Sequence, residues 1–297
     1  MMETSTKQSL NDFLAPHAVR AQAELERWLV EPEAPAPLAE AMRYCALGGG
    51  KRLRPAIVYL AAGAVGDAAG ELVGRAAAAV EMVHAYSLVH DDLPAMDDDD
   101  LRRGRPTAHV KFGEAMAILA SDAILTRAFG VLGEAQDPRA GALVAELARG
   151  AGAAGMVTGQ VADMGLCAVP ADTADFRYIH LHKTAALLRA SARMGAIAGG
   201  GSQTQVEALG EYARAIGLAF QVVDDVLDVT GAAADLGKTP GKDAQAGKRT
   251  VVAALGLEGA MALAGQLTDQ AVALAGAFGP PGQPLVSLAK LLGRRRA

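Results

Sequence analysis

The 297-residue sequence has little that would suit a disulfide-rich or nucleic-acid-binding protein. Two cysteines, Cys45 and Cys167, are too few for a disulfide framework or a thiolate metal site, and we expect free core thiols in a reducing compartment. With 28 basic and 33 acidic residues the net charge is −5, which argues against a nucleic-acid partner. Hydrophobic residues make up 51% of the chain, which excludes disorder and is ample for a large core.

Targeting and membrane segments are not expected either. Charges are spread through residues 3–27, so no apolar core of a signal peptide fits there. The long uncharged stretch 271–289 contains three prolines, which would interrupt a spanning helix. The sequence therefore predicts a cytoplasmic protein with no membrane insertion.

Strands also have little support, because β-branched residues in period-two alternation are almost absent while alanine and leucine are abundant. The 34 glycines and the 4% aromatic residues favour helices that pack closely through small side chains. No linker or change of composition divides the chain, so we expect one all-α domain over residues 1–297. Helices are predicted at about 38–46, 55–66, 71–93, 113–134, 140–165, 173–200, 204–229 and 258–277.

Two distant segments each bring an apolar helix to a pair of aspartates. In the later segment Asp224, Asp225 and Asp228 form D-D-x-x-D, and Asp224 and Asp228 lie one turn apart on a helical face that Gln221 and Gly217 extend. Two like charges on an otherwise apolar helix are destabilising unless a cation pairs with them.

The earlier segment begins at Asp91 and continues to a run of aspartates that starts at Asp97. Pro94 lacks a backbone donor, so the chain should bend there and let Asp97 return toward Asp91 despite its non-helical spacing. Ser87 and His84 share the helical face of Asp91.

The simpler interpretation of each acidic segment alone is a solvated patch or helix end. Both segments, however, follow apolar helices, and hard divalent cations favour oxygen ligands in such places. Mg²⁺ bound through a few carboxylates and the phosphates of a substrate is the natural candidate.

Basic residues occur where an anionic substrate would need them. Each alone is more simply a surface charge, but together with the paired carboxylates they favour diphosphate binding. A later lysine-rich loop would suit a lid over a diphosphate. The basic residues are Lys51 and Arg54 after a glycine turn, Arg102 and Arg103 after the first aspartates, Lys183 in an apolar helix, and Lys238 in the loop.

Two weaker candidates remain open. Asp163 either pairs with a lysine beside the metal site or is a satisfied core acid. The C-terminal run Arg294 to Arg296 either folds over a phosphate or, more simply, is a solvated tail.

Together these residues resemble the trans-isoprenyl diphosphate synthases, most closely the bacterial farnesyl diphosphate synthases. The resemblance implies an all-α, single-domain helical bundle around a central cavity, and a Mg²⁺-dependent condensation of isopentenyl diphosphate with an allylic diphosphate. It covers nearly the whole chain and rests on GGKRLRP (49–55), HDDLPAMDDDDLRRGRPT (90–107), GQVADM (159–164), HKTAALL (182–188), FQVVDDVLDVTG (220–231) and LGKTPGKD (236–243).

The resemblance also implies a role for each matching residue, with Mn²⁺ as an alternative ion for a multi-ion Mg²⁺ cluster. The metal would be bound by Asp91, Asp97 and Asp224, with Asp92, Asp225 and Asp228 in support. The allylic diphosphate would be held by Arg102, Lys183 and Lys238, and isopentenyl diphosphate by Lys51, Arg54, His84 and Arg103. The developing allylic cation would be stabilised by Thr184 and Gln221. The family further implies a homodimer. The chain departs from the family pattern at Thr250-Val251-Val252, where Thr-Tyr-Pro is common.

Product length is a matter of geometry. Tyr86 lies about 7–8 Å deeper than Asp91 along the helix, and its ring, beside Ser87, would form the floor of a tunnel. Within the family, a tyrosine here and the two extra residues Pro94 and Ala95 resemble enzymes that make the C15 product. We therefore favour farnesyl diphosphate, with geranylgeranyl or geranyl diphosphate as alternatives.

Other classes of protein fit less well. A class I terpene cyclase would replace the second D-D-x-x-D with an Asn/Ser/Glu motif and would not need Lys51 and Arg54. A non-catalytic partner subunit would tend to lose the aspartates, whereas both clusters are present. A simple cation-binding protein would explain the acids but not the basic residues.

Overall fold

The structure is a computed structural model that describes residues 9–170, 174–230 and 250–294. Its first half contains α1 (Leu10–Trp28), α2 (Ala36–Ala46), α3 (Leu53–Val65), α4 (Glu71–Asp91), α5 (Ala108–Phe112), α6 (Glu114–Gly133) and α7 (Ala140–Ala151). Its second half contains α8 (Met156–Asp163), α9 (Asp175–Ile179), the π-helix η1 (His180–Ala185), α10 (Ala186–Ala198), α11 (Gln203–Thr230), α14 (Val251–Gly276), the 3₁₀ turn η2 (Pro280–Gly282) and α15 (Gln283–Gly293). The two-residue strands β1 (Leu101–Arg102) and β2 (Arg105–Pro106) pair antiparallel, with Leu101 opposite Pro106.

The all-α prediction is confirmed, with differences at helix ends and breaks. The predicted helix at 140–165 is two helices, α7 and α8, because Gly155 packs where a Cβ would lie 2.2 Å from the carbonyl oxygen of Gly150. Helix α14 begins at residue 251 rather than 258 and passes through Gly256, whose φ of 71° interrupts it. Helices α1, α5 and α15 were not among the predicted ones.

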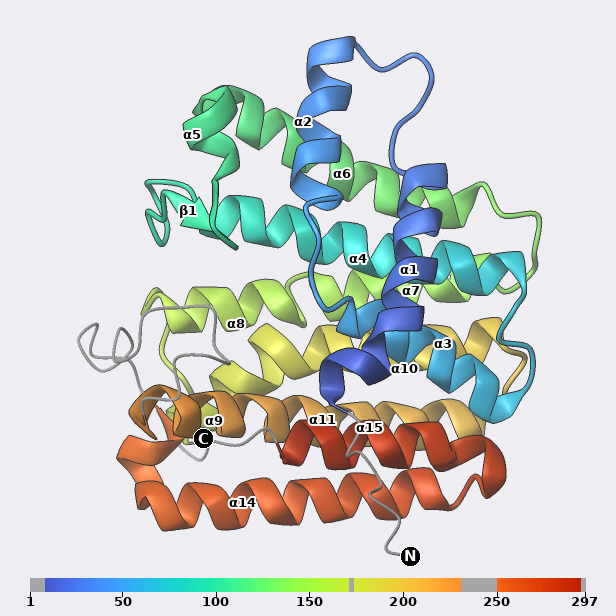
Figure 1. The fold of residues 1–297 in the computed structure, drawn as a ribbon, viewed down its shortest axis with the longest axis vertical. Coiled ribbons are helices and arrows are strands. Elements are labelled where there is room, and N and C mark those ends of the chain that lie inside the picture. Colours follow the sequence, from blue (N-terminus) through green and yellow to red (C-terminus); the bar gives the residue numbers. More distant parts are fainter. Residues whose placement is uncertain (1–8, 171–173, 231–249, 295–297) are drawn as a thin grey trace, which may run out of the picture.

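Helix α4 forms the centre of the bundle, and α1, α3, α6 and α10 pack around it (Figure 1). Four successive alanines, residues 76–79, have no exposed surface, so neighbouring helices approach its backbone on every side. This burial is consistent with the small-residue packing that the composition predicts. Of the two cysteines, Cys45 is half-buried, but Cys167 is exposed, so the expectation of a core thiol is wrong for Cys167.

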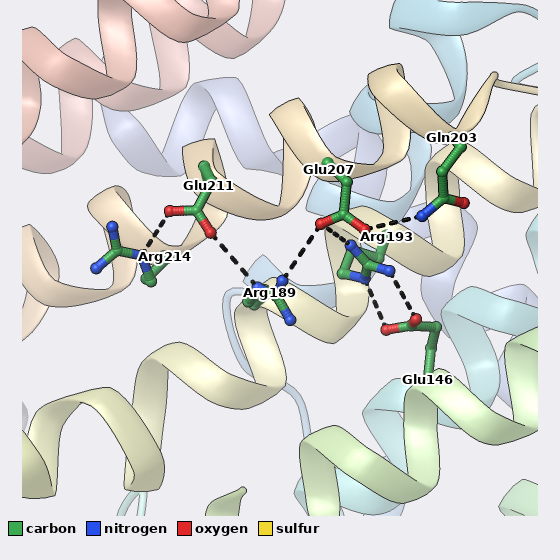
Figure 2. Close-up of polar contacts among 7 residues, drawn as sticks. All are labelled: Glu146, Arg189, Arg193, Gln203, Glu207, Glu211 and Arg214. Carbon is green, nitrogen blue, oxygen red and sulfur yellow. Dashed lines mark hydrogen bonds and ion pairs between the residues drawn. The ribbon is translucent and has the colours of Figure 1, made fainter.

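A network of charged side chains joins α7, α10 and α11 on the outside of this core (Figure 2). Arg193, which is 5% exposed, donates from Nε and NH2 to the two carboxylate oxygens of Glu146, at 2.8 and 2.9 Å. The Nη1 of Arg193 also lies 2.7 Å from Oε2 of Glu207. Arg189 and Arg214 extend the network through Glu207 and Glu211 along the exposed side of α11.

Within the described residues, three helices are long and apolar enough to cross a membrane. In α4, 83% of the apolar window is buried inside the protein, so the core accounts for its composition. In α6 the buried share is 44%, and in α14 it is 17%. Helix α14 lies at the outer edge of the bundle and leaves Leu255, Leu257 and Met261 exposed (Figure 1).

Candidate active site

The first aspartate segment begins where α4 ends, and its backbone folds back on itself. The amide of Asp97 donates to the carbonyl oxygen of Asp91 at 2.8 Å, and the amide of Met96 donates to Leu93 at 2.8 Å. The turn contains Pro94, which cannot donate a helical hydrogen bond. This turn brings the backbone of Asp97 next to that of Asp91 even though the two residues are six positions apart in the chain.

Asp92 faces a different partner. Arg102, in β1, donates from Nε to both carboxylate oxygens of Asp92 at 2.8 Å and from NH2 to Oδ1 at 2.5 Å. Asp92 is 3% exposed, so this bidentate contact is sheltered from water. The sequence assigned Asp92 to the metal and Arg102 to the diphosphate, whereas the structure pairs the two directly.

The carboxyl group of Asp91 lies in an environment that disfavours its charge. Burial raises the pKa of Asp91 to about 6; the charge of Lys183 lowers it, and that of Asp97 raises it further. Lys183 comes from η1, so the first aspartate segment and η1 act on each other across the bundle. A carboxylate with this balance of burial and like charge is suited to a bound cation.

The π-helix η1 packs between α8 and α11 at very short range. A Cβ on Gly159 of α8 would lie 2.0 Å from the backbone nitrogen of Lys183, and one on Gly217 of α11 would lie 2.8 Å from the Cα of Ala185. Glycine is therefore required at both contacts. Single π-helical turns within α-helices are found frequently at functional sites.

Side chains on η1 contact both neighbouring helices. The Nζ of Lys183 lies 2.5 Å from Oδ2 of Asp163, the last residue of α8. The hydroxyl of Thr184 is hydrogen-bonded to Oε1 of Gln221 on α11, about one turn before Asp224. Of the two open interpretations of Asp163, the structure therefore shows the one in which it pairs with a lysine.

Figure 1 shows that the C-terminal ends of α4 and α11 lie at the same side of the bundle, with α8 between them. Both aspartate segments are at these ends. They are thus not on opposite surfaces, and η1 is in contact with α8 and α11 between them.

A second group of predicted residues comes together beside the glycine turn before α3. Desolvation lowers the pKa of Arg54 to about 10. The charge of Glu81 opposes this shift, and the charge of Arg103 adds to it. Desolvation also holds the pKa of His84 well below its usual value, and the charges of Arg54 and Arg103 lower it further. The guanidinium of Arg103 donates to the carbonyl oxygen of Gly49. The guanidinium groups of Arg54 and Arg103 therefore form one cationic corner, which also contains the imidazole of His84.

Arg52, in the same basic stretch, is a structural residue. It is 5% exposed, and it donates to Oε1 of Glu81 at 2.8 Å, to the carbonyl oxygen of Ala46 at 2.8 Å and to Gln22 at 3.1 Å. It also adopts a left-handed φ of 50° just before α3. Lys51, by contrast, is exposed.

Tyr86 is 7% exposed and meets the ring of His90 edge-on at 5.6 Å. His90 Nε2 is hydrogen-bonded to Oγ of Ser121, a fully buried residue of α6. Ser87 is half-buried and donates to the carbonyl oxygen of His84 at 3.0 Å. Tyr86 therefore packs against His90, whose position is fixed by its hydrogen bond to Ser121 of α6.

The second aspartate motif and the lysine-rich loop are the remaining predicted parts of the site. Asp224 and Asp228 are half-buried on α11. Lys238 and the loop around it, and Arg295 and Arg296, lie outside the described residues. In the part of the chain that the structure describes, no three His, Cys, Asp or Glu side chains form a preformed metal cage.

Two buried polar residues were not predicted from the sequence as parts of this region. His180 is the first residue of η1, and its Nε2 lies 3.7 Å from Oδ2 of Asp225. Glu81 holds Arg52 and acts on Arg54. Glu81 lies three residues before His84, one helical turn away, and this spacing was a signal that could have placed it.

Comparisons with known proteins identify the family. A family model described as polyprenyl synthetase matches residues 35–273. The chain is 52% identical to farnesyl diphosphate synthase of Escherichia coli over 79% of this chain and 80% of that protein. It is also 47% identical to the chloroplastic geranylgeranyl pyrophosphate synthase 11 of Arabidopsis thaliana, over 88% and 75% of the two chains.

A solved structure of an FPP/GFPP synthase from Zymomonas mobilis is similar in fold, with a TM-score of 0.81 and 38% identity over 95% of this chain and 97% of that chain. A geranyltransferase from Legionella pneumophila superposes with a TM-score of 0.79 and 32% identity, with 96% of each chain covered. The protein belongs to the polyprenyl synthetase family.

Proposed function

We propose that the protein condenses isopentenyl diphosphate with dimethylallyl or geranyl diphosphate to give farnesyl diphosphate. One observation carries the proposal: η1 connects the two aspartate segments, because Lys183 acts on the charge of Asp91 while Thr184 is bonded to Gln221 beside Asp224. The farnesyl diphosphate synthase of E. coli, 52% identical, supports the same reaction.

The oxygen ligands at the aspartate segments suit Mg²⁺, with Mn²⁺ as an alternative ion. Asp91 and Asp97 would hold it at the first segment, and Asp224 with Asp228 at the second. When bound, the metal supplies Lewis-acid stabilisation of negative charge on the departing diphosphate. The raised pKa of Asp91 supports this fit, since a nearby divalent cation would favour the ionised carboxylate.

The protein's own groups would do the rest. Arg102, oriented by Asp92, and Lys183, oriented by Asp163, would hold the allylic diphosphate, together with Lys238. As the allylic C–O bond breaks, its electron pair leaves with the diphosphate, and the oxygens of Thr184 and Gln221 would face the positive charge that develops.

Isopentenyl diphosphate would bind in the cationic corner. Lys51, Arg54, His84 and Arg103 provide the charge and hydrogen-bond donors for a second diphosphate. The double bond of this substrate would attack the allylic cation and form the new C–C bond, which leaves a cation on the isopentenyl unit. This intermediate would lose a proton to the released diphosphate, and the electron pair of that C–H bond would form the double bond of the product. The buried apolar face of α4 would keep water from the cation.

The C15 product is supported by the ring of Tyr86, which is buried five residues before Asp91. A geranylgeranyl product is the second candidate, because the Arabidopsis relative that is 47% identical is named for it. Geranyl diphosphate synthesis and a non-catalytic partner role are further alternatives.

We also propose a cytoplasmic homodimer with a single domain. Helix α6 supports the dimer: it leaves Ile118 and Leu119 at 41% and 59% exposure, and less than half of its apolar window is buried. Apolar surface of this kind on a helix next to the core is typical of subunit interfaces.

The test is an assay of the purified protein with dimethylallyl and isopentenyl diphosphates, with and without Mg²⁺, followed by identification of the prenyl products. We expect Mg²⁺-dependent C15 product. A C20 product would support the second candidate. No condensation, whether alone or with a related synthase added, would contradict the enzymatic proposal.

A further inference from the structure

Asp225 is the member of the second aspartate motif that lies deepest in the protein. It is 8% exposed, whereas Asp224 and Asp228 on either side are half-buried. Its Oδ2 accepts a hydrogen bond of 2.8 Å from the backbone nitrogen of Val251. This bond joins α11 to the first residue of α14, across 26 positions of sequence.

The bond satisfies a donor that a helix cannot satisfy itself. The first N–H groups of a helix have no partner within it, and the positive end of the helix dipole favours a carboxylate nearby. At α14 the Oγ1 of Thr250 accepts from the amide of Ala253 at 3.2 Å, and Asp225 accepts from the amide of Val251. Val251 has no exposed surface, so water cannot replace Asp225 there.

Apolar packing fixes the same junction. Val251 belongs to a small cluster with Val222, Val223 and Val226 of α11, separate from the main cores of the molecule. The start of α14 is therefore set by one hydrogen bond and one cluster, both supplied by the turn of α11 that carries the aspartate motif.

Asp225 also faces η1. The Nε2 of His180 lies 3.7 Å from the same Oδ2, which is beyond hydrogen-bond length. Burial lowers the pKa of His180 to about 4, and the charge of Asp163 opposes this change, so His180 is within electrostatic reach of Asp163 as well as close to Asp225. Asp163 in turn holds Lys183.

We propose that Asp225 is a positioning residue, which acts through its hydrogen bond to Val251 and its contact with His180 rather than by binding the metal. It holds three parts in fixed relation: the aspartate motif on α11, the start of α14, and η1 with Lys183 and Thr184. Loss of the bond would let the start of α14 move and would disturb the groups on η1. The consequence for turnover rests on the proposed function; the anchoring bond does not.

The test compares Asp225→Asn, Asp225→Ala and Asp224→Asn in the full-length protein. Asparagine keeps an oxygen that can accept from Val251, but it lacks the negative charge through which a carboxylate binds Mg²⁺ tightly. We expect Asp225→Asn to keep kcat within about tenfold of the unchanged protein, with the same Mg²⁺ concentration for half-maximal rate. Asp225→Ala should lose about 10–100-fold, as is usual for residues that orient a site. Asp224→Asn should lose about 100-fold or more and require more Mg²⁺.

Hydrogen exchange at the amide of Val251, followed by NMR, is the readout that does not depend on activity. We expect slow exchange in the unchanged protein and in Asp225→Asn, and fast exchange in Asp225→Ala with unchanged helix content by circular dichroism. If Asp225→Ala does not fold, the Asp225→Asn protein still tests the inference, through the exchange rate of its Val251 amide and the Mg²⁺ concentration that it needs for half-maximal rate.

Two results would overturn the inference. One is an Asp225→Asn enzyme whose Mg²⁺ requirement rises as much as that of Asp224→Asn, because Asp225 would then act as a ligand. The other is a Val251 amide that exchanges fast in the unchanged protein or in Asp225→Asn, or stays slow in Asp225→Ala. If no variant and not even the unchanged protein condenses the substrates, the proposed function fails, while the exchange data still decide whether Asp225 is the anchor.

Discussion

The Nζ of Lys183 and the Oδ2 of Asp163 lie 2.5 Å apart, and this ion pair joins η1 to the end of α8. The side chains are 28% and 18% exposed, so the pair is partly shielded from solvent. A lysine held in this way has a fixed position relative to Asp91, which lies within reach of its charge. We interpret Asp163 as the residue that orients Lys183 toward the diphosphate.

Replacement of Asp163 by asparagine should therefore lower kcat by about 10–100-fold, because Lys183 would lose its orientation but not its charge. Lys183→Ala should cost more, about 100–1000-fold in kcat, because it removes a group that we propose stabilises the leaving diphosphate. Steady-state kinetics of both variants and of the double variant would check this. Independent, multiplicative effects of the two changes would contradict a shared role.

Asp91 gives a prediction about pH and stability. Its pKa in the folded, metal-free protein is raised from 3.8 to about 6, so folding favours the protonated form. A raised carboxyl pKa contributes stability at low pH, and this contribution is lost as the pH rises through 6. At pH 8 without Mg²⁺, Asp91→Asn should therefore raise the Tm by about 2–4 °C, while at pH 4 the two proteins should unfold at similar temperatures.

The same variant should lose about 100-fold or more in kcat, because a proposed metal ligand is removed. Added Mg²⁺ should raise the Tm of the unchanged protein more than that of Asp91→Asn at pH 8. Thermal unfolding followed by circular dichroism, at pH 4 and pH 8 with and without Mg²⁺, measures all four cases. An Asp91→Asn protein that is less stable than the unchanged protein at pH 8 would contradict the environment described for this carboxyl group.

Much of this arrangement could be predicted from the sequence, because it depends on local spacing. The turn at Pro94 that returns Asp97 to Asp91, and the face shared by Gln221 and Asp224, follow from helix geometry and from the missing proline donor. Helix α1 also has a readable signal in the sequence, the capping box of Ser9 and Asp12, although the helix contains Pro16.

Contacts between distant elements could not be predicted in the same way. The pairing of Asp92 with Arg102 depends on how β1 folds back toward the C-terminal end of α4 (Figure 1), and the bond from Val251 to Asp225 depends on the packing of α14. No spacing rule in one sequence distinguishes a carboxylate that binds a metal from one that holds an arginine or caps a remote helix. Those roles are decided by tertiary packing.

Tyr86 provides a prediction about product length. Its ring is buried against His90, which Ser121 holds from α6. Tyr86→Ala should therefore open space below the substrate and shift the products from C15 toward C20, as seen by chromatography of the dephosphorylated alcohols. Tyr86→Phe is the matched control: it keeps the ring and removes only the hydroxyl, so its products should remain C15. An unchanged C15 profile for Tyr86→Ala would remove Tyr86 from this role.

The charged network of Figure 2 should matter for stability and not for the chemistry. Arg193→Met would leave the carboxylate of Glu146, whose side chain is 11% exposed, without its bidentate partner, and should lower the free energy of unfolding by about 3–5 kcal/mol. The double variant Arg193→Met/Glu146→Leu removes both charges and should recover most of that loss, because two apolar side chains can fill the space. Urea unfolding of the three proteins gives the energies, and kcat measured well below the Tm is expected to stay unchanged. A double variant as unstable as Arg193→Met alone would mean that the arginine contributes through packing of its own side chain and not through the buried pair.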